Sequence, residues 1–90
     1  MREEDALFNW LQMRVVADAR PQDEAARKTL EFFLDVLGED HAITSPQISH
    51  TDDTMIHVKY EKNGKSKTQL IPREAGEQLL ADIIANPKFN

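Results

Sequence analysis

The chain has 90 residues, with 11 basic and 16 acidic side chains and a formal net charge of −5. Hydrophobic residues make up 40% and charged residues 30%, a composition typical of a small globular domain and not of a disordered chain. Cysteine is absent, which excludes disulfides, thiol nucleophiles and cysteine-ligated metals. The net negative charge disfavours binding of nucleic acid or of an anionic membrane by the whole surface. Binding of such a partner by a local basic patch remains an alternative.

No apolar run reaches the roughly 18 residues that a membrane-spanning helix needs. The N-terminal residues 1–5 are mostly charged and lack the apolar region of a signal peptide. We therefore expect one domain over residues 1–90 of a soluble, cytoplasmic protein of bacterial or phage type.

Two helices are predicted in the N-terminal half, over about residues 4–19 and 21–37. The first helix carries two apolar stripes at helical spacing. They run through Leu7, Leu11 and Val15 and through Ala6, Trp10 and Met13. The Arg20-Pro21 step separates the helices because a residue before proline avoids the helical conformation. Gly38 is expected to end the second helix in the left-handed conformation.

The two helices are apolar around more of their circumference than a chain of this size is expected to cover. Apolar residues of the second helix span roughly 200° of its wheel, about twice the usual minimum for a surface helix. We therefore expect a homodimer, or another protein partner, at these helices. The residues expected at the interface are Trp10, Met13, Phe32 and Val36. A position in the core is the alternative interpretation for Trp10.

After residue 41 the apolar spacing changes from helical to alternating. Residues 47–51 are expected to form a short first strand, because Pro46 can begin an edge strand but cannot lie inside a central one. A hairpin is predicted over about residues 54–71, since Asn63-Gly64 between two alternating runs is a strong turn signal. The first strand and the two strands of the hairpin are therefore expected to form a three-stranded antiparallel meander.

The register of the hairpin depends on the length of its loop. A two-residue turn would pair Val58 with Gln69. A three-residue loop over residues 62–64 would instead pair Val58 with Thr68 and Ile56 with Leu70. We expect the longer loop, because its register gathers the apolar residues on one face.

A third helix is predicted over about residues 72–85, with an ordinary one-sided apolar face, and residues 87–90 are expected to fray. Gly76 on that face would allow close approach to the strands. The expected order is α-α-β-β-β-α, an α+β fold with two N-terminal helices, a three-stranded antiparallel meander and a C-terminal helix.

From residue 21 onward the order α-β-β-β-α is similar to that of double-stranded-RNA-binding domains, and the helix–hairpin order is similar to that of winged-helix domains. In the RNA-binding family a lysine cluster opens the last helix, whereas here Arg73 is followed by Glu74 and Glu77. No separate recognition helix precedes the hairpin, as a winged helix would require. The resemblance is limited to the order of elements.

Two groups of polar residues offer alternatives to protein binding. The hairpin carries Lys59, Lys62, Lys65 and Lys67, which could contact the phosphates of a nucleic acid. His50, Asp52, Asp53 and His57 lie around a turn, and His50, Asp53 and His57 could form a small metal site or a hydrolase centre. A structural turn with solvent-facing histidines is the preferred interpretation. No glycine-rich phosphate loop or nucleophile elbow is present. We expect a non-enzymatic protein without a cofactor, an adaptor or regulator that works by binding protein.

Overall fold

The computed structural model of the chain describes residues 1–86. Six elements follow one another in the order α1 (Glu3–Ala19), α2 (Glu24–His41), β1 (Ile43–Thr51), β2 (Met55–Lys62), β3 (Lys65–Pro72) and α3 (Arg73–Ala85). The predicted α+β fold of order α-α-β-β-β-α is therefore confirmed. The expectation of a frayed end at residues 87–90 lies outside the described residues.

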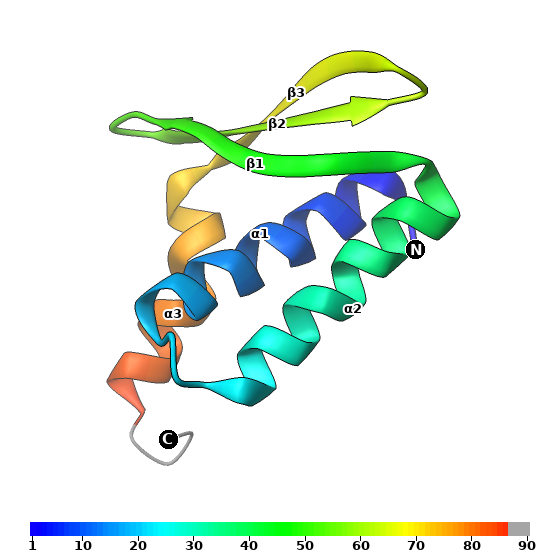
Figure 1. Cartoon of the computed structure of the whole chain (residues 1–90). Helices are drawn as coiled ribbons and strands as arrows, with labels where there is room; N and C mark the ends of the chain where they lie inside the picture. The colour runs from blue at the N-terminus through cyan, green and yellow to red at the C-terminus, as the bar shows by residue number, and fades with distance from the viewer. Residues whose placement is uncertain (87–90) are drawn as a thin grey trace.

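The molecule has two layers (Figure 1). An antiparallel sheet of order β1-β2-β3 forms one layer, and the three helices lie together on one of its faces. Helix α1 lies between α2 and α3 and packs against both. The opposite face of the sheet is not covered by any element of residues 1–86. Within the same residues no helix is long and apolar enough to cross a membrane.

Helix α1 is the central helix of the core. Four of its buried side chains come from the two predicted stripes: Ala6, Leu7, Trp10 and Leu11. Val16, which belongs to neither stripe, is buried as well. Both stripes contribute to the core because α2 and α3 flank the helix and the sheet lies over it. The other large apolar side chains of α1, Phe8, Met13 and Val15, are half-buried, so α1 keeps little apolar surface for a partner.

Helix α2 begins and ends later than expected. Asp23 caps its N-terminus, and the carboxylate accepts a hydrogen bond from the Ala26 N–H at 3.0 Å. The helix continues through Gly38 to His41, so the predicted stop at Gly38 is wrong. The left-handed residue at the C-terminus is Ala42, with φ of 55°, and its N–H donates to the Leu37 carbonyl. A glycine inside a helix costs only about 1 kcal/mol relative to alanine, too little to end a helix by itself.

Strand β1 starts at Ile43, four residues before the expected strand at 47–51. It includes Pro46, which a central strand would exclude. The pairing with β2 shifts by one residue between Thr44 and Gln47, and Ser45 in this bulge has φ of 54°. Because β1 is an edge strand with a bulge, the missing N–H of the proline breaks no ladder hydrogen bond.

The hairpin closes with the two-residue turn, so the preferred three-residue loop is wrong. Asn63 and Gly64 have φ of 52° and 78°, as a type I′ turn requires. Val58 pairs with Gln69, and Ile56 pairs with Ile71 in place of Leu70. The type I′ turn matches the twist of the strands, and the core needs only one apolar partner from β3. That partner is Ile71, which is 5% exposed.

Helix α3 approaches the core closely at one point. A Cβ at Gly76 would lie 3.1 Å from side-chain carbons of both Leu11 and Ile56, so the glycine permits the contact between α3, α1 and the sheet. Beyond Gly76 the apolar face is only half covered, and Leu79, Leu80 and Ile83 are partly exposed. The one-sided pattern of α3 predicts a helix laid over the sheet, but the core covers only the part of this face near Gly76.

Candidate functional site

Large apolar side chains remain exposed on α2, on α3 and on the open face of the sheet. Phe32 and Leu34 of α2 are 57% and 42% exposed, Leu70 of β3 is 48% exposed, and Ile84 of α3 is 67% exposed. Full burial of a side chain of this kind stabilises a fold by about 1.5–3 kcal/mol, and these four residues obtain only part of it. The predicted excess of apolar surface therefore exists on α2 and not on α1.

Trp10 lies in the core of its own chain. The side chain is 2% exposed and belongs to the main apolar cluster. It forms part of the floor of a shallow hollow of about 370 Å³, whose lining includes Arg14, Arg27 and Pro46. Trp10 therefore has almost no surface with which to contact a partner, and we exclude it from the interface proposed below. Its core position was the alternative interpretation.

Phe32 is the most exposed of the residues expected at an interface. Its ring contacts Phe33 edge to face, with ring centroids 5.3 Å apart and an interplanar angle of 74°. Phe33 packs against the core and holds the inner side of the Phe32 ring, while the outer side is free. Val36, one turn later on α2, and Met13 on α1 are half-buried. Of the four predicted interface residues, only Phe32 has a side chain that is mostly exposed to solvent.

A second apolar surface lies on α3, outside the predicted interface residues. A hollow of about 410 Å³ is lined by Leu79 and Ile83 together with Asp23 and Asp82. The pattern of α3 showed a narrow apolar face but not how far the neighbouring elements reach along it. The sequence could not show where the core stops along α3, because that depends on the tertiary packing of α1 and the sheet.

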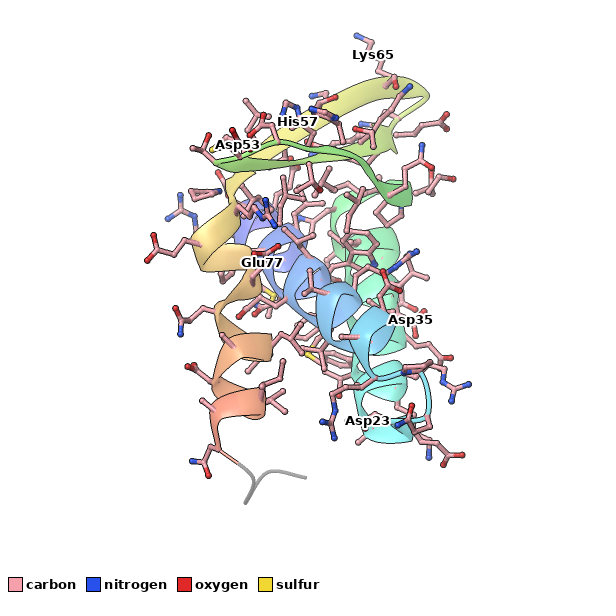
Figure 2. All side chains as sticks on the ribbon, turned by 90° about the vertical axis from the view of Figure 1, so that its left-hand side faces the viewer. Asp23, Asp35, Asp53, His57, Lys65 and Glu77 are labelled. Atoms are coloured by element: carbon pink, nitrogen blue, oxygen red, sulfur yellow. The ribbon has the colours of Figure 1, made fainter. Side chains whose placement is uncertain are left out.

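The four lysines of the hairpin do not form one patch. Lys59 pairs with Thr68 on the open face of the sheet, whereas Lys67 pairs with Tyr60, which is buried on the helix-facing side. Lys62 forms an ion pair with Glu3 at the start of α1. Lys65 is exposed at the tip of the hairpin (Figure 2).

The N-terminal acidic residues also reduce the positive field of the hairpin. The hydrogen bond from Lys62, and then the charges of Lys62, Lys67 and His41, hold the pKa of Glu3 below its ordinary value against the opposing effect of burial. Glu3 is therefore a carboxylate at neutral pH that faces two of the four lysines. This arrangement gives little support to phosphate binding by the hairpin.

The structure brings both strand histidines together on the open face of the sheet. His50 of β1 and His57 of β2 are cross-strand partners, with ring centroids 5.1 Å apart. The Nε2 atom of His57 lies 3.0 Å from Oδ2 of Asp52. One ligand atom from each of these three residues lies within 4.8 Å of the other two. Figure 2 shows His57 on the side of the sheet away from the helices.

The acidic member of this cluster is Asp52 and not Asp53, which corrects the predicted set. The Oδ1 atom of Asp52 accepts hydrogen bonds from the N–H groups of Thr54 and Met55 at 3.0 and 2.7 Å, so the carboxylate folds back over the turn. Asp53 lies one residue further on and lines a hollow with Arg73 on the other side of the turn. The hydrogen bond to His57, followed by those from the two backbone groups, lowers the pKa of Asp52 far below its ordinary value.

Compared with models of known protein families, with curated proteins and with solved structures, the chain matches none.

Proposed function

We propose that this protein is a small, non-enzymatic protein-binding module, an adaptor or regulator, and that it self-associates through α2. The observation that carries the proposal is the 57% exposure of Phe32 in the middle of this helix. An exposed aromatic ring that packs on one side against a neighbouring aromatic ring is a typical hot-spot residue of protein interfaces. The absence of cysteine supports a reducing, cytoplasmic compartment.

The charges beside Phe32 favour a second copy of the chain as the partner. Lys28 lies four residues before Phe32 and Asp35 three residues after it, so at helical spacing all three share one flank of α2. Two antiparallel α2 helices that cross at Phe32 would bring Lys28 of each copy close to Asp35 of the other. A parallel pair would place like charges together. The self-complementary arrangement is a twofold symmetric dimer.

The size of α2 limits the strength of this dimer. The helix has 18 residues, and at a rise of about 1.5 Å per residue it is about 27 Å long. A pair of helices of this length buries less than the roughly 800 Å² per partner of a standard interface. We therefore expect a dissociation constant on the order of micromolar.

The test is the mass in solution as a function of protein concentration, by sedimentation or light scattering. We expect a transition from 10.3 kDa to twice that mass between about 1 and 500 µM. Phe32→Glu should give a monomer with an unchanged circular dichroism spectrum, because Phe32 contributes little to the core. Lys28→Glu should weaken the dimer through like-charge repulsion with Asp35, and the added Asp35→Lys change should restore it.

Ile84→Glu is the matched control, since it places the same charge at an apolar residue of α3 that is even more exposed than Phe32. This variant should dimerise like the parent chain. A parent chain that stays monomeric over the whole range, or a dimer that Ile84→Glu dissociates and Phe32→Glu does not, would overturn the proposal.

A further inference from the structure

We propose that His50, Asp52 and His57 bind one divalent transition-metal ion of the zinc type on the open face of the sheet, with water completing its coordination. This site is independent of the proposed dimer, because it lies on the layer opposite α2. Two imidazole nitrogens and one carboxylate oxygen form a donor set that zinc accepts, and a site with three protein ligands keeps a position open for water.

The distances fit such an ion. Zinc–ligand bonds of about 2.1 Å in a tetrahedral arrangement place neighbouring ligand atoms about 3.4 Å apart. Nε2 of His57 and Oδ2 of Asp52 are already 3.0 Å apart, and the whole set lies within 4.8 Å. A shift of at most about 1.4 Å therefore closes the set around an ion. The exposed side chain of His50 can supply this shift by rotation about its side-chain bonds.

A β-bulge in β1 places His50 on the same face as His57. Ile48 pairs with Val58, and an uninterrupted ladder would then pair His50 with the buried Ile56 on the helix-facing side. The observed pairing shifts by one residue between Ile48 and His50, so His50 pairs with His57. Bulges commonly redirect a side chain in this way next to functional sites.

The residue inserted by the bulge is itself held in place. The Ser49 hydroxyl donates a hydrogen bond to the His57 carbonyl at 3.2 Å, which ties the bulge to the strand that carries the second ligand. The bulge and the histidine pair are thus parts of one local structure.

The carboxylate of Asp52 is oriented before any ion binds. Its Oδ1 atom accepts the N–H groups of Thr54 and Met55, which leaves Oδ2 directed at His57. Hydrogen bonds of this kind to the second oxygen orient metal-binding carboxylates and are worth about 10–100-fold in affinity. An ion at the site would replace the hydrogen that Oδ2 of Asp52 and the ring nitrogen of His57 share.

The site is tested by titrating the purified chain with Zn²⁺ near neutral pH and measuring heat and stoichiometry. We expect one ion per chain with a dissociation constant on the order of micromolar, and at least about 10-fold weaker binding for His50→Gln, His57→Gln and Asp52→Asn. Asp52→Asn is informative because an amide oxygen can still accept the Thr54 and Met55 bonds, so the turn is retained.

Two matched control variants distinguish this site from nonspecific metal binding by surface residues. Asp53→Asn removes the neighbouring carboxylate, and His41→Gln removes the remaining histidine; both should leave the affinity within about twofold. Three outcomes would overturn the site: no saturable binding below about 100 µM, equal loss for Asp53→Asn and Asp52→Asn, or one ion per two chains. Circular dichroism of each variant checks that the fold is retained.

Discussion

At the C-terminal end of α2, replacing Gly38 by alanine distinguishes two local conformations. The change in the free energy of unfolding has opposite signs for the two. If Gly38 were a left-handed helix stop, as its sequence context suggests, alanine would be strained there and would lower the free energy of unfolding by about 1 kcal/mol. In the structure Gly38 is helical, and a Cβ would meet only the Ile43 carbonyl oxygen at 3.9 Å. Gly38→Ala should therefore raise the free energy of unfolding by about 1 kcal/mol, the difference in helix propensity.

The reciprocal change lies four residues later. Ala42 has φ of 55°, and a left-handed residue with a Cβ costs roughly 1 kcal/mol or more. Glycine removes this cost but loses more conformational entropy on folding, so Ala42→Gly should stabilise the chain by a smaller amount, about 0.5 kcal/mol. The double variant should combine both gains, because each acts through a different residue.

Urea unfolding followed by circular dichroism measures these differences, at one fixed protein concentration because self-association also stabilises the fold. A gain of 1 kcal/mol corresponds to roughly 4–8 °C in the thermal midpoint of a domain of this size. Gly76→Ala is the control, because the new Cβ would lie 3.1 Å from carbons of Leu11 and Ile56. Overpacking of about 1–3 kcal/mol should outweigh the gain in helix propensity there. If Gly38→Ala destabilises the chain, the helical assignment of Gly38 is refuted.

Two further predictions concern the hairpin and acid stability. In urea unfolding, Ile71→Ala should lower the free energy of unfolding by about 2–4 kcal/mol and Leu70→Ala by less than about 1 kcal/mol. The reason is that Ile71 is 5% exposed and Leu70 is 48% exposed. Equal losses would contradict the two-residue turn. Hydrogen bonds lower the folded-state pKa of Glu3 and Asp23 from ordinary values of 4.5 and 3.8. A lowered pKa stabilises the fold above the ordinary value, and this stabilisation is lost as pH falls through the folded-state pKa. The urea concentration at the unfolding midpoint should therefore not change with pH near about pH 6 and should decrease when the pH is lowered below about 4. The decrease should be smaller in Glu3→Gln and Asp23→Asn. A midpoint that rises on acidification would show that the carboxylates are not stabilising.

The order and type of the elements could be predicted because they depend on short-range patterns. Helical spacing in α1, α2 and α3 and alternation in β2 are properties of neighbouring residues, and Asn63-Gly64 suits few conformations other than a type I′ turn. The length of that turn and the paired register were harder to predict, because the choice depended on which residues of β3 the core would need. Only the position of the helices beneath the sheet decides that Ile71, and not Leu70, is buried.

The functional surfaces depended still more on tertiary structure. The apolar excess of α1 and α2 was visible in the sequence, but which part is covered was not, because burial depends on the elements packed alongside. Trp10 is covered and Phe32 is not, although both lie on apolar stripes. Likewise, the sequence showed two histidines and two aspartates near a turn. A one-residue bulge in an edge strand and two backbone hydrogen bonds then placed His50 and Asp52 beside His57.

By itself, then, the sequence determined the α+β order, the approximate bounds of the helices and the site of the hairpin, because local periodicity and turn chemistry act between residues close in the chain. The tertiary structure decided where α2 ends, how the strands pair, which apolar residues remain exposed and which polar residues meet. These features depend on packing between segments far apart in the chain, and a shift of one residue in strand pairing turns a side chain to the other face of the sheet.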